Sequence, residues 1–144
     1  MPEKPTMNDM MEAYALDAVD HAKQAMGVDL DFSPESVRKV ESILATMFEA
    51  RPKGFLSRLF SKGPSPELLD TFSKMYGAYV GEVLRRAGGG EWFVDTEVAP
   101  GHRVIGLRKG DGRIWPTAKV GKRLTNGSED NVWHYFQIIR EEHW

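Results

Sequence analysis

The spacing of the apolar residues changes partway along this chain of 144 residues, and the change limits the folds that it can adopt. Up to about residue 87 the apolar residues recur every three or four positions, which is the spacing of amphipathic helices. After the glycines at 88–90 they alternate over short runs, as they do in strands. Because the expected strands follow one another without helices between them, the order predicts an α+β fold and argues against a doubly wound nucleotide-binding fold.

Three helices are expected before the glycines, at about 8–26, 34–50 and 66–87. The order Ser-Pro-Glu, which begins at Ser33 and again at Ser65, predicts the starts of the second and third helices. A serine caps free backbone amides at such a start, and the proline suits the first helical position. The apolar residues of the third helix are spread over a wide arc, so we expect it to be the central helix of the core.

Three short strands and one or two further helices are expected after the glycines. The strands are predicted at about 91–95, 103–108 and 112–115, and the helices at about 117–124 and 129–142. A glycine-rich turn at 109–112 joins the last two strands as a hairpin. The stretch 132–139 is apolar enough to be a strand as well, although we favour a helix. The sequence therefore predicts a single α+β domain over residues 1–144, with the N-terminal helices and the long central helix packed on a small antiparallel sheet.

The composition excludes several classes of protein. The chain has no cysteine, which rules out a disulfide scaffold, a thiol nucleophile and a cysteine-ligated zinc site. No apolar run reaches the roughly 18–20 residues that cross a bilayer, and the first residues do not form a secretory signal, so we expect a cytoplasmic protein. The four histidines lack the spacing of metal ligands, and no nucleophile-elbow sequence occurs. We therefore expect no cofactor, no bound metal and no enzymatic activity.

Basic residues are concentrated in one block. Residues 103–123 hold seven basic side chains and one acidic side chain, although the whole chain carries a net charge of −2. Such a block can attract an acidic protein surface or a nucleic acid, or it can be solvated or paired with the acidic first helix. Nucleic acid is the weaker alternative, because the chain as a whole is mildly acidic and the block holds no nucleic-acid-binding motif. We predict that an acidic partner protein is steered by Arg108, Lys109, Arg113, Lys119, Lys122 and Arg123.

Aromatic residues near these charges are the expected apolar anchors of the contact, because aromatics tend to dominate interface energies. They are Trp115 in the block itself, and Phe55 and Phe60 in a second basic segment. That segment, residues 51–62, carries four basic side chains and no acidic one. Three roles are open for it: a cover over the helices, a contact with the partner, or a contact with an anionic membrane surface.

The third helix holds two glycines one turn apart, Gly77 and Gly81. A glycine inside a helix costs roughly 0.8–1 kcal/mol relative to alanine, so the pair needs a local reason. The smooth strip that they form allows the close approach of another backbone, which belongs either to this chain or to a partner or ligand. The ligand alternative involves Tyr76, Gly77, Gly81, Glu82, Arg85 and Arg86, with Glu82 and Arg86 spaced for an ion pair along the helix.

Three motifs follow one another in the second half of the chain: Y-x-G-E-V-x-R-R at 79–86, G-G-x-W at 89–92 and P-x-x-K-V-x-K-R-L-x-N-G at 116–127. In this order they resemble a group of small bacterial domains of unknown function. The resemblance covers roughly residues 68–140, and it implies a helix that leads into a sheet and a bacterial cytosolic setting. Because the group has no assigned activity, the resemblance implies no catalytic residues.

We expect a non-catalytic bacterial protein that binds another protein, as an immunity protein or an adaptor does, by analogy of size and setting. The first alternative is a sensor domain for a small molecule or an anionic ligand, with a pocket beside Gly77 and Gly81 of the central helix. The second alternative is a small enzyme, which a buried carboxylate beside a histidine in one cleft would favour.

Overall fold

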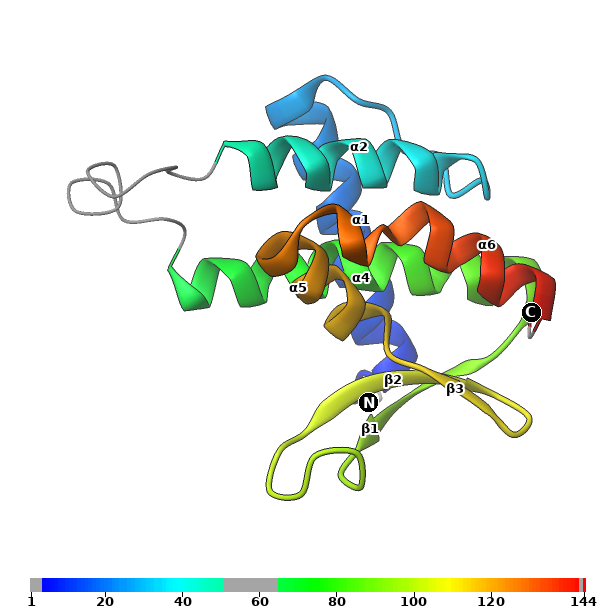
Figure 1. Cartoon of the computed structure of the whole chain (residues 1–144). Helices are drawn as coiled ribbons and strands as arrows, with labels where there is room; N and C mark the ends of the chain where they lie inside the picture. The colour runs from blue at the N-terminus through cyan, green and yellow to red at the C-terminus, as the bar shows by residue number, and fades with distance from the viewer. Residues whose placement is uncertain (1–3, 51–64, 143) are drawn as a thin grey trace.

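The computed structural model of this chain describes residues 4–50, 65–142 and 144, and it has an α+β fold (Figure 1). The elements are α1 (Met7–Met26), α2 (Ser36–Glu49), α4 (Pro66–Gly88), β1 (Glu91–Asp95), β2 (Val104–Lys109), β3 (Gly112–Ile114), α5 (Pro116–Asn126), the short 3-10 helix η1 (Ser128–Asp130) and α6 (Val132–Glu142). The predicted fold class is thereby confirmed, with helices before and after one small antiparallel sheet. The predicted anchors Phe55 and Phe60 lie outside the described residues.

The three strands form one antiparallel sheet in the order β1-β2-β3, so β2 is central. Trp92 pairs with Leu107, and Leu107 pairs with Ile114. All three side chains are buried, and they mark the inner face of the sheet, which packs toward the helices. The opposite face carries Phe93, Gly106, Arg108 and Arg113. In Figure 1 the sheet lies below the helices, at one end of the molecule.

The helix α4 is the centre of the core, as its wide apolar arc predicts. Ten consecutive residues, 75–84, are buried, and α4 packs against both α1 and α5. Its two interior glycines permit this packing. A Cβ at Gly77 would overlap the backbone of Thr117, and a Cβ at Gly81 would overlap the indole ring of Trp92. The strip is therefore filled by this chain's own helix and strand.

Local hydrogen bonds account for the starts of α1 and α2, which differ by one and two residues from the predicted starts. The helix α1 begins with a capping box, in which the Asp9 amide donates to Thr6 Oγ1 at 3.1 Å and the Thr6 amide donates to Asp9 Oδ2 at 3.0 Å. The helix α2 begins at Ser36, two residues later than predicted, because Ser33 and the two residues after it form a turn. The Ser36 amide donates to the Ser33 carbonyl at 3.0 Å, which closes that turn before the helix begins.

The last part of the chain is helical, which confirms the favoured prediction for residues 132–139. The helix α6 starts at Val132 and not at 129, because residues 128–130 form a separate 3-10 turn. Asn131 is extended, and its side chain accepts the His134 amide at 2.8 Å. Trp144 is docked, since its indole donates to the Gly89 carbonyl at 2.8 Å. In the part of the chain that the structure describes, no helix combines the length and the apolar character needed to span a membrane.

Candidate protein-binding surface

The face of the sheet that points away from the helices carries an aromatic ring between two arginines. Phe93 is central, with the guanidinium carbon of Arg108 5.3 Å and that of Arg113 5.6 Å from the centroid of its ring. The cross-strand partner of Phe93 is Gly106, and a Cβ at this glycine would stand 2.6 Å from the ring. The missing side chain therefore lets the ring of Phe93 lie across β2. We call Phe93, Arg108, Arg113 and Trp115 the outer face.

The two arginines of the outer face are direct cross-strand partners. Like charges placed directly opposite each other destabilise a sheet. Each arginine also has an acidic neighbour, Glu91 at 3.4 Å from Arg108 and Glu97 at 3.8 Å from Arg113, but the arginine side chains remain 47% and 49% exposed. Exposed ion pairs of this kind contribute only about 0–1 kcal/mol. Both guanidinium groups are therefore available to another carboxylate at little cost.

Trp115, the fourth residue of the outer face, is held in place by a buried carboxylate. Its indole donates to Asp95 Oδ2 at 3.1 Å, while Asp95 Oδ1 accepts the amides of Glu97 at 2.8 Å and Val98 at 3.2 Å. These bonds, that of Glu97 above all, hold the pKa of Asp95 below its ordinary value, although burial acts in the opposite direction. The same carboxylate thus fixes both the indole and the loop that follows β1.

Three lysines of the predicted basic surface lie away from the outer face. Lys109 falls on the inner side of the strand, with its ammonium nitrogen 5.7 Å from the ring centroid of Trp144. Lys119 is only 22% exposed and pairs with Asp130 at 3.0 Å. Lys122 is exposed, but it lies on α5 and not on the sheet. Of the predicted partner-binding residues that the structure describes, it therefore brings together only Arg108, Arg113 and Trp115.

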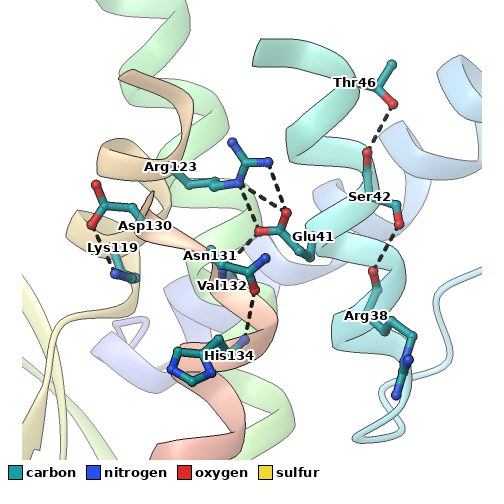
Figure 2. A network of polar contacts seen from close by, with 10 residues as sticks. All are labelled: Arg38, Glu41, Ser42, Thr46, Lys119, Arg123, Asp130, Asn131, Val132 and His134. Carbon is teal, nitrogen blue, oxygen red and sulfur yellow. Dashed lines mark hydrogen bonds and ion pairs between the residues drawn. The ribbon is translucent and has the colours of Figure 1, made fainter. Parts of the chain in front are cut away.

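Arg123 is not a surface charge, and its predicted role in steering a partner is wrong. Its side chain is 4% exposed, and it donates through Nε and Nη2 to the carboxylate of Glu41 at 2.9–3.1 Å (Figure 2). Glu41 also accepts the amide of Val132 at 2.9 Å. The pair thus joins α5 to α2 and to the start of α6. A guanidinium enclosed among three helices stabilises the fold and cannot attract a distant partner.

The pocket predicted beside Gly77 and Gly81 is not open, because Thr117 and Trp92 occupy the space next to the two glycines. Tyr76, which was expected to line it, is fully buried, and its hydroxyl lies 2.6 Å from Nδ1 of His21. The ligand alternative therefore has no cavity at this strip within the described residues.

The charged residues of the same helix serve the fold. Glu82 is fully buried and pairs with Arg85, whose Nε and Nη2 lie 2.6 and 3.0 Å from the carboxylate. It also accepts the indole N–H of Trp92 at 3.1 Å, which ties α4 to β1. The predicted pair of Glu82 with Arg86 is wrong, because Arg85 and the indole of Trp92 already hold the Glu82 carboxylate. Arg86 instead lies over the ring of Phe32, 3.6 Å from its centroid.

Phe93 was not predicted to belong to the site, and Asp95, interpreted from the sequence as ordinary surface charge, is in fact buried. Alternation in the predicted strand places these two residues on the face opposite to Trp92. Trp92 was the obvious core residue, so Phe93 and Asp95 belonged on the open face. The missing information was the register with β2, which places Gly106 opposite Phe93.

No family model, curated protein or solved structure matches this chain. The resemblance to small bacterial domains of unknown function therefore stays a prediction. Within the described ranges, no three histidine, aspartate or glutamate side chains are grouped so that they could hold a metal ion.

Proposed function

We propose that this chain is a non-catalytic binding domain that recognises an acidic, partly apolar segment of another protein on its outer face. The observation that supports this most directly is the ring of Phe93 held between Arg108 and Arg113, which are paired across the strands. Two like charges at this position weaken the sheet, and contact with partner carboxylates would offset that cost. An adaptor or an immunity protein, the role expected from the sequence, also acts by binding another protein without catalysis.

The residue types of the outer face favour a protein partner. Arginine and the large aromatics dominate the binding energy of protein interfaces, and Trp115 is already fixed by Asp95 before any partner arrives. Such pre-organisation lowers the ordering cost of binding. The guanidinium groups select carboxylates, with which they form paired, charge-assisted hydrogen bonds.

A nucleic acid is a poorer occupant of the same face. Glu91 and Glu97 flank the two arginines and are largely exposed, so the positive charge of the face is confined to two separate guanidinium groups. A nucleic-acid-binding surface carries a continuous excess of positive charge, which this face lacks. A protein segment can place single carboxylates at the arginines and apolar side chains on Phe93 and Trp115.

The test is capture of partners from a lysate of the source cells at low salt, with three immobilised forms of the chain. The forms are the wild type, the outer-face variant Arg108→Gln/Arg113→Gln, and a control, Lys23→Gln/Lys122→Gln, with the same change in net charge. We expect the wild type and the control to retain one stoichiometric protein that a salt step releases. The outer-face variant should bind this protein about tenfold or more weakly, as expected for hot-spot arginines.

Two results would contradict the proposal. One is equal retention of the partner by the wild type and the outer-face variant. The other is equal loss in the outer-face variant and the control, because net charge alone would then account for binding. Circular dichroism of all three forms separates loss of binding from loss of folding, and all four substituted side chains are at the surface.

A further inference from the structure

A pocket of about 230 Å³ lies between the helices α1, α2, α4 and α5. Its lining includes His21, Met26, Met47, Leu69, Phe72 and Leu124, and the histidine is the one polar side chain among the described lining residues. The pocket is separate from the outer face and from the filled strip at Gly77 and Gly81. An apolar cavity of about 150 Å³ already accommodates benzene, so this pocket has room for one aromatic ring with a small substituent.

The ring of His21 is held in place at this pocket by two contacts. Tyr76 is fully buried, and its hydroxyl lies 2.6 Å from Nδ1 of His21. The ring of Phe72 packs against the same imidazole, with the two ring centroids 4.9 Å apart. Both contacts are made within this chain, so the imidazole is oriented before any ligand binds, which lowers the ordering cost of binding.

The contact with Tyr76 also decides which nitrogen of His21 carries the proton. Burial raises the pKa of Tyr76 and lowers the pKa of His21, so both side chains are neutral near pH 7. A buried tyrosine hydroxyl needs an acceptor for its proton, and Nδ1 of His21 is its one acceptor among the described residues. Tyr76 therefore donates to Nδ1, and the proton of the neutral imidazole is on Nε2.

Nε2 of His21 is thus a donor that has no partner in the part of the chain that the structure describes. Among those residues, Nη1 of Arg123 is the enclosed side-chain nitrogen or oxygen that lacks a hydrogen bond, so Nε2, which also lacks one, is accessible. The two nitrogens of an imidazole point in different directions, so Nε2 faces away from Tyr76. The pocket therefore has one oriented, accessible N–H group in an otherwise apolar lining.

We infer that this pocket binds an uncharged, single-ring aromatic molecule that carries one hydrogen-bond acceptor, such as a carbonyl oxygen. The acceptor would bind the Nε2–H group of His21. The ring would lie among Phe72, Met26 and Met47, because thioether sulfurs make favourable contacts with aromatic rings. A charged ligand is a poorer occupant, because the described lining offers no charged side chain to offset its loss of hydration. Sites for small molecules commonly combine an apolar lining with a few oriented polar groups.

The test is a titration of the ¹⁵N-labelled chain, followed by NMR, with two probes of nearly the same shape. Acetophenone carries a carbonyl acceptor, and α-methylstyrene carries none. We expect saturable shifts of the amides around His21, Met47 and Phe72 with acetophenone. The ¹⁵N signal of Nε2 of His21 should move with acetophenone and not with α-methylstyrene, which is a readout that needs no variant.

The double variant His21→Phe/Tyr76→Phe removes both partners of the buried hydrogen bond and so should keep the fold. It should weaken acetophenone binding about fivefold, the loss expected for one hydrogen bond, and leave the binding of α-methylstyrene unchanged. His134→Phe makes the same histidine substitution at an exposed position of α6 and should change neither affinity. Met47→Trp fills the pocket and should weaken the binding of both probes at least about tenfold.

Four results would overturn the inference. They are a titration with acetophenone that does not saturate, an Nε2 signal that acetophenone leaves unmoved, an equal effect of the double variant on both probes, and wild-type binding by Met47→Trp. Circular dichroism of each variant separates loss of binding from loss of folding. None of the substituted residues belongs to the outer face, so this test is independent of the partner proposed there.

Discussion

The buried pair of Arg123 and Glu41 allows one prediction to be worked out in detail. We expect Arg123→Met to be among the most destabilising single substitutions in the chain. The guanidinium is 4% exposed and the carboxylate of Glu41 is 13% exposed, so both charges depend on each other and not on water. Without Arg123, the Val132 amide at 2.9 Å would be the carboxylate's one remaining donor among the described residues (Figure 2).

The size of the effect follows from this burial. Removing one member of a buried ion pair costs about 3–5 kcal/mol, because it leaves an uncompensated charge in the interior. For a chain of this length each kcal/mol lowers the melting temperature by roughly 2–4 °C, so we expect a decrease of roughly 6–20 °C. Lys23→Met removes the same charge from an exposed pair with Asp29, and it should cost less than about 1 kcal/mol.

A double substitution separates the penalty of an unpaired charge from loss of packing. In Glu41→Leu/Arg123→Met both charges are absent, and the Nη1 group of Arg123, which is buried without a hydrogen-bond partner in the described residues, is removed as well. The double variant should therefore be more stable than Arg123→Met alone. Urea denaturation followed by circular dichroism measures five proteins: the wild type, Lys23→Met, Arg123→Met, Glu41→Leu and the double variant. The reasoning is refuted if Arg123→Met costs less than about 1 kcal/mol, or if the double variant loses the sum of the single losses.

Three further predictions concern the packing, the pH dependence and a helix start. Gly81→Ala should lower the free energy of unfolding by about 1–3 kcal/mol in urea denaturation, because its Cβ would overlap the ring of Trp92. At Gly121 the nearest atom to an added Cβ is the Ser73 hydroxyl at 3.2 Å, so Gly121→Ala should lower the free energy of unfolding less. The pKa of Asp95 is lower in the folded protein than in the unfolded chain, so its ionised carboxylate stabilises the fold at pH values above the ordinary aspartate pKa. This stabilisation is lost as the pH falls through the folded-state pKa. The free energy of unfolding should therefore decrease less steeply with falling pH in Asp95→Asn than in the wild type. The same decrease in both proteins would contradict this role of Asp95. Thr6→Ala should cost about 1 kcal/mol by removing the cap of α1, which thermal unfolding would detect.

Local sequence patterns predicted the order and type of the elements well, because each pattern acts over a few residues. The glycines at 88–90 end α4, and the bounds predicted for β1 agree with the structure. The helix α2 begins two residues later than predicted because a turn closed by the Ser36 amide and the Ser33 carbonyl precedes it. Tyr79, 43 residues away from Ser36, contacts this turn, with its hydroxyl 2.5 Å from the Ser36 hydroxyl and 2.8 Å from the Phe32 amide. Contacts at such separation are invisible to a local pattern.

The candidate site was predicted less well, because counting charges along a segment says nothing about which way each side chain points. The seven basic residues of 103–123 lie in different environments. Arg108 and Arg113 lie on the outer face, Lys109 lies on the inner side of the sheet near Trp144, and Arg103 is exposed before β2. On α5, Lys119 is paired, Lys122 is exposed and Arg123 is buried. Strand alternation would have separated Arg108 from Lys109, but only tertiary contacts reveal that α5 turns Arg123 inward.

This distribution changes how charge variants of the block must be interpreted. Charge reversal at Arg123 would place two carboxylates together in the interior, so any loss of binding would reflect loss of folding. Reversal at Lys119 would break its pair with Asp130, whose carboxylate is only 18% exposed, and would have the same ambiguity. Arg108 and Arg113 are half-exposed and their ion pairs are weak, so their removal tests binding with little change in stability. The salt dependence of association should therefore decrease with these two arginines replaced, and with Lys122 replaced it should stay as in the wild type.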